Sequence, residues 1–399
     1  MCRILCGAHL AVKKQLPLVL DSLRGDPSFF SNVTRWEVIP RRLGEFKALP
    51  LDLKPSIRHA LEGRGICKLY SHQNLTYRLV RNEKNVCLVT PSASGKTLSY
   101  NLPILQSLSE RSDSTAIYLF PTKALAHDQL IEIDSLVSES EINASVFSFD
   151  GDSPASSKLN IRANGRIVLT NPDMLHIGIL PNHPKWVRLF SGLRFVVIDE
   201  LHTYRGVFGS HLANVVRRLK RIANYYGAKP QFICCSATIG NPIELCQNLI
   251  GEQSILVDND GSPRGERHFL MYNPPFTRQD RGIRRSVVDE ASEISFRLLQ
   301  FRIKTIIFSR SRINTELIGK YLRKRIKRSG AKDLNDTIAS YRGGYLPRER
   351  RLIEKGLRDG SLLCVASTNA LELGIDIGEL DASVIAGFPG TIASCWQQA

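Results

Sequence analysis

The sequence has no long hydrophobic run, no C-x-x-C pair and no short-period repeat. None of its 399 residues lies in an apolar stretch near the roughly 18 residues of a membrane span, and the apolar segment at the start is too short for a secretory signal. We therefore expect a cytoplasmic protein outside the membrane. Nine cysteines without a C-x-x-C pair argue against a zinc knuckle or redox motif. With 43% hydrophobic and 23% charged residues, disordered and low-complexity classes are also excluded.

Acidic residues are few relative to basic ones. The chain has 54 Lys and Arg against 38 Asp and Glu, a net charge of +16. This surplus predicts a polyanion or an anionic membrane surface as partner, and the lack of an amphipathic anchor favours the polyanion. Residues 301 to 359 alone hold 17 basic and six acidic residues. They are candidates for phosphate contacts without sequence preference, and the alternative for residues 323–328 is a solvated helix face.

From residue 86 onward, short apolar runs alternate with longer amphipathic ones. This pattern indicates parallel strands joined by crossover helices, and the fold class is therefore α/β. The predicted strands are 86–90, 116–120, 145–149, 167–170, 195–199, 232–235, 255–257, 305–308, 338–341, 362–366 and 384–386. We predict a lead-in over 1–69 that packs on the first domain, a first domain over 70–260, a Gly- and Pro-rich linker over 261–285 and a second domain over 286–399.

The segment TPSASGKT, residues 90–97, lies between a predicted strand and a predicted helix. Such a loop directs backbone N–H groups at phosphates, Lys96 supplies a positive charge, and the Thr97 hydroxyl can bind Mg²⁺. Thr90 stands where the first glycine of the pattern is expected. The alternative is an ordinary strand-to-helix turn.

Two carboxylates, Asp199 and Glu200, follow the apolar run FVVI at the carboxyl end of a predicted strand. Ligands of open parallel sheets bind at that edge. Asp199 is the candidate for Mg²⁺ and Glu200 for polarising the water that attacks a γ-phosphate. A solvated helix cap is the alternative, but the phosphate loop about a hundred residues upstream favours a nucleotide site.

The order of these motifs resembles superfamily 2 helicases of the DExH type. The segments that carry the resemblance are YSHQ (70–73), PTKALA (121–126), TNPDM (170–174), DELH (199–202), SAT (236–238), IFSRSR (307–312) and STNALELGID (367–376). The resemblance implies that Lys96, Asp199 and Glu200 are catalytic. It implies ATP contacts by Tyr70, Gln73, Ser92, Ala93, Ser94, Gly95, Lys96, Thr97 and Asp376. It implies coupling of hydrolysis to movement by His202, Ser236 and Thr238, and nucleic-acid contacts by Thr122, Lys123, Thr170, Arg310, Arg342, Gly343 and Thr368.

Residues 198–211, 260–266 and 341–345 are closer to one branch, the MrfA/YprA-like DNA helicases and their fungal Hrq-type relatives. This resemblance covers roughly residue 65 to the end. It implies two tandem RecA-like domains with ATP and Mg²⁺ as cofactors. It also implies an ATP-driven motor that moves three-prime to five-prime on DNA and acts in DNA repair.

The last residues limit what the resemblance implies. Gln397 is similar to the opening residue of helicase motif VI, whose two arginines do not follow. One of them is an arginine finger in the family, an interaction worth about 10³ or more in rate. We therefore expect the second domain to be incomplete and ATP turnover by this chain to be weak or absent. Two alternatives remain open, an RNA-directed DExH helicase and a non-catalytic fragment that binds ATP and nucleic acid.

Overall fold

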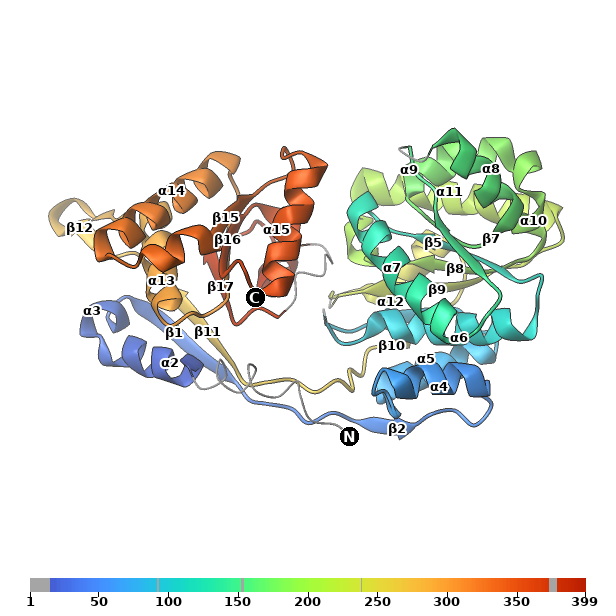
Figure 1. Cartoon of the computed structure of the whole chain (residues 1–399), viewed down its shortest axis with the longest axis horizontal. Helices are drawn as coiled ribbons and strands as arrows, with labels where there is room; N and C mark the ends of the chain where they lie inside the picture. Colours follow the sequence, from blue (N-terminus) through green and yellow to red (C-terminus); the bar gives the residue numbers. More distant parts are fainter. Residues whose placement is uncertain (1–14, 92, 152–153, 238, 373–378) are drawn as a thin grey trace. The chain divides into compact units, whose positions relative to one another are not determined.

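The computed structural model describes residues 15–91, 93–151, 154–237, 239–372 and 379–399. The chain forms two compact units (Figure 1). Residues 41–265 make up one of them, which we refer to as the continuous unit, and residues up to 40 join residues 266–399 in the other, the split unit. None of the helices in the described ranges is long and apolar enough to cross a membrane.

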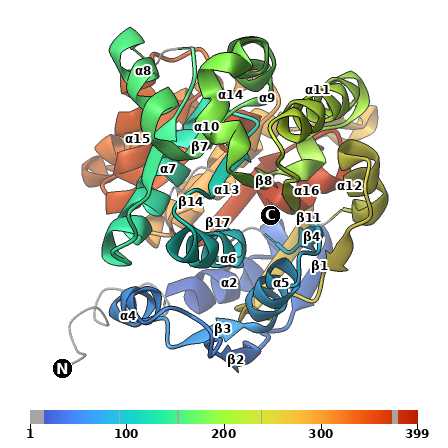
Figure 2. The ribbon, with the colours of Figure 1, turned by 90° about the vertical axis from the view of Figure 1, so that its right-hand side faces the viewer.

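The continuous unit is built on a seven-stranded parallel sheet in the order β10-β4-β9-β8-β5-β7-β6. Its strands are β4 (Val86–Val89), β5 (Thr115–Leu119), β6 (Ser145–Ser148), β7 (Gly165–Thr170), β8 (Leu193–Ile198), β9 (Gln231–Ser236) and β10 (Ile255–Val257). All seven coincide with strands predicted from the sequence. A separate antiparallel pair, β2 (Phe46–Ala48) and β3 (Lys68–Tyr70), lies beside α5 (Ser71–Arg81), as Figure 2 shows.

Alternate residues of each strand enter two different hydrophobic cores. In β4, Val86 and Leu88 face one core and Cys87 and Val89 face the other. Because both faces are buried, the strands read as continuous apolar runs. Helices that supply the first core are α4 (Pro55–Gly63), α5, α6 (Lys96–Glu110) and α7 (Lys123–Glu139). Those that supply the second are α8 (Ala155–Asn164), α10 (Val187–Ser191), α11 (Gly206–Tyr225) and α12 (Pro242–Ile250). Short helical turns complete the unit at α9 (Pro172–Met174), η1 (Leu175–Ile179), η2 (Leu180–Trp186) and η3 (Leu201–Thr203).

The split unit contains a four-stranded parallel sheet in the order β15-β16-β14-β17. Its strands are β14 (Thr305–Ser309), β15 (Ile338–Tyr341), β16 (Cys364–Ser367) and β17 (Ala382–Ala386). Its helices are α13 (Val287–Gln300), α14 (Arg312–Ser329), α15 (Pro347–Asp359) and α16 (Ile392–Gln398), with the turns η5 (Lys332–Thr337) and η6 (Asn369–Leu371). The four predicted strands and the predicted helix at 287 are present.

The expectation of a lead-in over 1–69 that packs on the first domain holds for residues 41–69, which belong to the continuous unit, but not for the residues before them. Helices α2 (Gln15–Gly25) and α3 (Pro27–Phe30) and strand β1 (Val33–Ile39) belong to the split unit. Strand β1 pairs antiparallel with β11 (Arg267–Tyr272), and α2 and α3 pack against α13 in a small core of their own. The pairing joins residues more than 200 positions apart, which local periodicity does not indicate.

The predicted linker, 261–285, also contains regular structure. Besides β11 it forms the hairpin of β12 (Phe276–Arg278) and β13 (Ile283–Arg284), with the turn η4 (Gln279–Arg281) between them. The Arg284 guanidinium lies 3.8 Å from the centre of the exposed Phe276 ring. Gly and Pro residues here mark turns between short strands, not an unstructured connection.

Candidate nucleotide-binding site

The candidate site lies at the carboxyl edge of three neighbouring strands, β4, β9 and β8. Strand β4 leads into the phosphate loop, β9 ends at Ser236, and β8 is followed by Asp199 and Glu200. Parallel strands place these segments at the same edge of the sheet, where open α/β sheets bind ligands.

The phosphate loop is closed by contacts among its own residues. The Thr90 and Ser94 hydroxyl groups are buried and 2.7 Å apart, which gives a physical reason for threonine where the usual pattern has glycine. The Lys96 Nζ donates to the Thr90 carbonyl at 3.1 Å. Ala93 is exposed with a φ of 59°. Ser92, a predicted ATP contact, lies outside the described residues.

Gly95 is required by both its backbone and its surroundings. It caps α6 with a φ of 80°, a conformation that glycine adopts without steric cost. A Cβ atom there would lie 2.6 Å from the Gln73 Nε2, so a side chain at this position would displace the glutamine.

The predicted adenine-reading element contacts this loop directly. Gln73 is buried, its Oε1 accepts from the Tyr70 backbone N–H at 2.9 Å, and its Nε2 donates to the Gly95 carbonyl at 3.1 Å. The structure therefore brings Gln73 and the phosphate loop together. Their contact with ATP stays a prediction.

The acidic pair is buried within the electrostatic influence of the Lys96 ammonium group. Asp199 and Glu200 are 7% and 6% exposed. Burial, with repulsion from Glu200, raises the pKa of Asp199 to about 6. Burial also raises the pKa of Glu200, against the influence of Lys96. Glu200 has a φ of 51°, a left-handed conformation that costs energy in a non-glycine residue and is concentrated at functional sites.

Tyr100 is a member of the site that the sequence patterns do not indicate. It is fully buried on α6, and its hydroxyl oxygen lies 3.3 Å from Asp199 Oδ2 and 3.2 Å from Gln129 Oε1, two acceptors that share its single proton. It also interacts with the Thr97 side chain. One turn of helix separates it from Lys96, so helical spacing could have placed it on the same face.

The candidate coupling residues lie next to the acidic pair. His202 Nδ1 is 3.3 Å from Glu200 Oε2 and 3.5 Å from Ser236 Oγ. Ser236 is fully buried, and its carbonyl accepts from the Thr90 N–H at 3.3 Å. A chain of contacts thus joins Glu200, the end of β9 and the phosphate loop. Thr238, the third candidate, lies outside the described residues.

The donor set at this edge fits Mg²⁺. Two buried carboxylates lie within the influence of the Lys96 ammonium group. Glu200 Oε2 accepts no hydrogen bond from a described residue, although His202 Nδ1 lies 3.3 Å from it. No group of three or more His, Cys, Asp or Glu side chains suited to a metal occurs in the part of the chain that the structure describes. Mg²⁺ usually takes one or two protein oxygens and completes its shell with water and phosphate. Thr97 and Asp199 would hold it here.

The candidate nucleic-acid contacts of the continuous unit follow β5 and β7. Thr122 caps α7 and accepts from the Leu125 N–H at 3.3 Å, and Lys123 is the exposed first residue of that helix. Thr170 is 1% exposed, and its hydroxyl donates to the Phe149 carbonyl at 2.7 Å. The Thr170 hydroxyl therefore has a structural partner, and the Lys123 side chain is exposed.

In the split unit the candidates gather at one sheet edge. Arg342 and Gly343 follow β15, Thr368 follows β16, and Arg310 follows β14, three strands that are neighbours in the sheet. The Arg342 Nε donates to Glu316 at 3.0 Å, and its guanidinium lies 5.0 Å from the Tyr345 ring centre. Asp376 lies outside the described residues.

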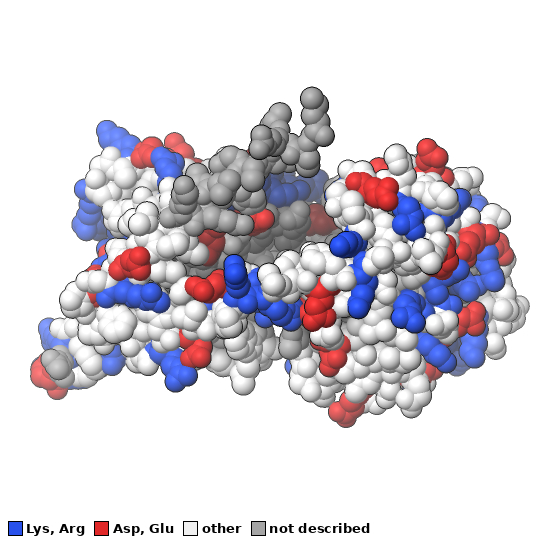
Figure 3. Space-filling model, turned by 90° about the horizontal axis from the view of Figure 1, so that it is seen from below, with Lys and Arg blue, Asp and Glu red and all other residues white. Residues whose placement is uncertain are grey.

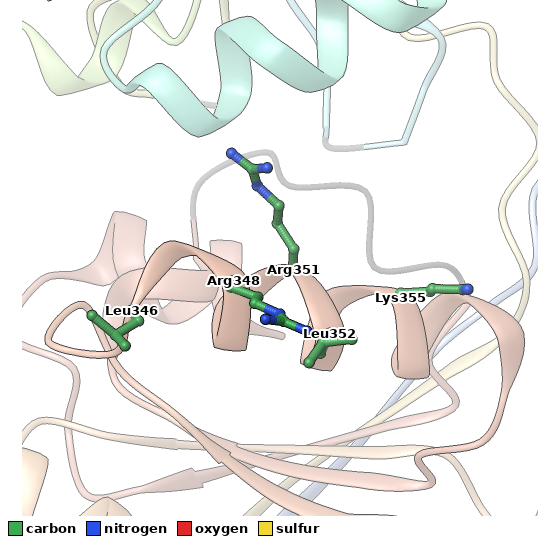
Figure 4. Close-up of a pocket in the computed structure, with 5 residues that line it drawn as sticks. All are labelled: Leu346, Arg348, Arg351, Leu352 and Lys355. Carbon is green, nitrogen blue, oxygen red and sulfur yellow. The ribbon is translucent and has the colours of Figure 1, made fainter. Parts of the chain in front are cut away.

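Some of the basic side chains form ion pairs and hydrogen bonds within the fold. On α14, Arg325 forms ion pairs with Asp289 and Glu293, and Arg323 donates to the Ile338 carbonyl. On the face that Figure 3 shows, Lys and Arg are interspersed with Asp and Glu. Helix α15, in contrast, carries the exposed cations Arg348, Arg351 and Lys355. Together with Leu346 and Leu352 they line a pocket of about 530 Å³ (Figure 4).

A phosphate loop and a buried acidic pair at the edge of a parallel sheet define a P-loop nucleotide-binding protein. Two family models match the chain, the DEAD/DEAH box helicase over residues 70–245 and the helicase conserved C-terminal domain over residues 290–399. The chain belongs to the superfamily 2 DEAD/DEAH-box helicases. The prediction of two tandem RecA-like domains is thereby confirmed.

Relatives with curated names are similar over almost the whole chain. The ATP-dependent helicase YprA of Bacillus subtilis is 49% identical, over 97% of this chain and 51% of YprA. HRQ1 of Saccharomyces cerevisiae, also named an ATP-dependent helicase, is 39% identical, over 96% of this chain and 36% of its own length. The crystal structure of MrfA bound to DNA and AMPPNP matches with a TM-score of 0.91 at 48% identity, over 96% of this chain and 52% of that one. The chain thus spans about half of YprA and MrfA, and less of HRQ1.

Proposed function

We propose that this chain is the motor core of an ATP-dependent DNA helicase that moves three-prime to five-prime and acts in DNA repair. The observation that carries the proposal is the buried Asp199–Glu200 pair beside Lys96 at the strand edge. The solved structure of MrfA, similar along 96% of this chain, holds DNA and AMPPNP, which supports DNA and ATP as ligands. Direction and repair rest on resemblance to that branch.

The residues have distinct roles in the proposed reaction. Lys96 binds the β- and γ-phosphates, together with the backbone N–H groups at the start of α6. Thr97 and Asp199 would hold Mg²⁺, which would neutralise phosphate charge. Glu200 accepts a proton from the attacking water, and its buried position beside His202 holds the carboxylate in one orientation. His202 and Ser236 connect that carboxylate to the end of β9.

DNA-stimulated ATP hydrolysis tests the proposal. We expect slow turnover in the parent chain, loss of nucleotide binding in Lys96→Ala, and retained binding in Glu200→Gln with turnover lower by about 10²-fold or more. The Gln side chain matches the shape of Glu but cannot take the proton. Equal turnover in the parent and Glu200→Gln would contradict the assignment of the base.

Two alternatives give different results in the same experiments. An RNA-directed helicase would be stimulated more by RNA than by a DNA strand of matched sequence. A non-catalytic fragment would bind ATP through Lys96 and bind DNA in a salt-sensitive manner, without turnover. Strand displacement on substrates with a tail at one end or the other reports the direction of movement.

A further inference from the structure

The chain enters the continuous unit at Arg41 and leaves it at Gly265, and these two segments are tied together. Arg42 and Arg264 form an antiparallel bridge, with N–H to carbonyl distances of 2.8 and 2.9 Å. The Arg42 guanidinium also binds the Asp260 carboxylate and donates to the Ser262 carbonyl at 2.9 Å. We refer to Arg42, Asp260, Ser262 and Arg264 as the clasp.

Asp260 is the centre of the clasp. It is 7% exposed and accepts from the Ser262 N–H at 2.9 Å, the Ser262 hydroxyl at 2.6 Å and the Arg264 guanidinium at 3.3 Å, in addition to Arg42. Burial alone would raise the pKa of Asp260, but the hydrogen bonds from Ser262 and Arg42 outweigh it and the pKa is lowered. The clasp therefore holds an ionised, fully hydrogen-bonded carboxylate.

Gly261 joins the clasp to the first turn of α5. Its N–H donates to His72 Nδ1 at 3.2 Å, and its carbonyl accepts from the Glu45 N–H at 2.8 Å. A Cβ atom at Gly261 would lie 2.1 Å from Ser71 Oγ and 2.8 Å from the Ser71 backbone nitrogen. The exit segment thus rests directly on the turn that carries Gln73.

His72 lies between this segment and the phosphate loop. It is 1% exposed, and since Nδ1 accepts from Gly261, the proton of the neutral ring is on Nε2. Burial lowers the pKa of His72 and favours that neutral form. The Nε2 atom makes no well-aligned hydrogen bond in the described ranges. The Ser94 backbone is nevertheless near enough for a weak hydrogen bond that raises the pKa of the ring, against the larger lowering by burial. A buried N–H without an acceptor is unfavourable, so a small shift of the loop that offers the Ser94 carbonyl would be stabilised.

We propose that His72 is a positioning residue that couples the phosphate loop to the clasp. Nucleotide binding aligns the Ser94 carbonyl with the Nε2–H and so fixes the orientation of the ring. The fixed ring stabilises the hydrogen bond from the Gly261 N–H to Nδ1, and with it the segments around Arg42 and Asp260. The continuous unit thereby reports nucleotide occupancy at its entry and exit segments. The inference rests on the proposed nucleotide site and gives a role to His72, Arg42 and Asp260, to which the sequence patterns assigned none.

Amide hydrogen exchange with and without AMPPNP and Mg²⁺ tests the coupling. The probes are the N–H groups of Arg42, Glu45, Gly261 and Arg264, all of which are hydrogen-bond donors in the structure. In the parent chain we expect the nucleotide to slow their exchange by at least about threefold, because stabilised hydrogen bonds open less often.

Two isosteric variants separate the two ring nitrogens of His72. His72→Asn keeps an acceptor near the Nδ1 position and removes the donor at Nε2, whereas His72→Gln can extend a donor to the Nε2 position. We expect AMPPNP to bind both within about threefold of the parent, since neither changes the phosphate loop. The slowing of exchange at Arg42, Glu45 and Arg264 should disappear in His72→Asn, which lacks the Nε2 donor. It should also disappear in His72→Gln, which leaves the Gly261 N–H without its Nδ1 acceptor. The nucleotide should also fail to slow exchange in Arg42→Gln. Because the Arg42 side chain is partly exposed, this variant tests the coupling without a substitution in the buried position 72.

The outcomes are distinguishable. Bound AMPPNP without slowed exchange in the parent, or equal slowing in His72→Asn, would overturn the coupling and leave the nucleotide site intact. No AMPPNP binding by the parent would overturn both the proposed function and this inference.

Discussion

At the scale of single residues, the site keeps two carboxylates in an environment that disfavours their charge. Asp199 and Glu200 are buried, and Lys96 opposes only part of their combined charge. Such an arrangement costs stability until a cation arrives. A site tuned for a divalent ion and a polyphosphate is therefore expected to destabilise the free protein.

Asp199→Asn tests this cost. The pKa of Asp199 is about 6 in the folded chain against an ordinary 3.8, so the folded state binds the proton more tightly than the unfolded state. The stabilisation from protonation is complete below pH 4 and is lost as the pH rises through 6. At pH 7 without nucleotide, the variant should be more stable by ~1–3 kcal/mol, although ATP turnover falls at least about 100-fold. Thermal unfolding at pH 4 and pH 7 checks it, since the advantage should shrink at the lower pH.

The residues that could be predicted are those whose signal is local in sequence. Lys96 and Thr97 follow a strand within one loop, and Asp199 and Glu200 follow another, so strand periodicity and motif spacing were sufficient. The contacts of Gly261 with His72, or of Arg42 with Asp260, join segments about 190 and 218 positions apart. No periodicity encodes such contacts, and they become visible only in the folded chain.

At the scale of elements, one buried arginine holds the end of a helix. Arg166 on β7 is 5% exposed and donates to four backbone carbonyls, those of Leu108, Arg111, Ser114 and Asn143. Two of these carbonyls lie at the carboxyl end of α6. Leu108 is in its last turn, and Arg111 is its C-cap residue. The guanidinium thus satisfies carbonyl groups that a helix end leaves unpaired.

Arg166→Met should therefore be strongly destabilising. Methionine fills similar space but leaves four carbonyls without their donor, and we expect a loss of about 2–4 kcal/mol in the free energy of unfolding. Arg188→Met is the matched control, because Arg188 is exposed and donates to a single carbonyl. Chemical denaturation of both variants checks the prediction, and a similar loss in the two would refute it.

Element prediction succeeded where both sheet faces are buried and failed where strands are short and half exposed. The eleven strands of the two parallel sheets were recognised from apolar runs. Strand β1 has no fully buried residue, and β12 is exposed along its length. Strand β1 pairs with the distant β11 and β12 with the adjacent β13, in both cases through backbone hydrogen bonds. Sequence periodicity therefore carries little information about these strands.

At the scale of the whole molecule, the two units differ in how they depend on the rest of the chain. Both cores of the continuous unit consist of residues between 49 and 257. The split unit, in contrast, needs Val19, Leu23 and Phe29 for the core that also contains Leu298 and Ile303.

A fragment of residues 41–265 should therefore unfold cooperatively by itself. A fragment of residues 266–399 should be unstable, because each missing large apolar side chain of the small core contributes roughly 1.5–3 kcal/mol when buried. Adding a peptide of residues 15–40 should restore its structure. Circular dichroism melts of the fragments, with and without the peptide, check this, and a stable 266–399 fragment would contradict it.

The pairing of β1 with β11 also orders events during synthesis. Ile39 pairs with Arg267, so β1 leaves the ribosome more than 200 residues before its partner exists, a delay of about 10–50 s at typical elongation rates. During that time nearly all of the continuous unit is synthesised, because the unit extends to Gly265. The nascent chain must therefore keep an unpaired strand edge soluble while the neighbouring unit forms, and a chaperone that binds extended segments would find its target near the start of the chain.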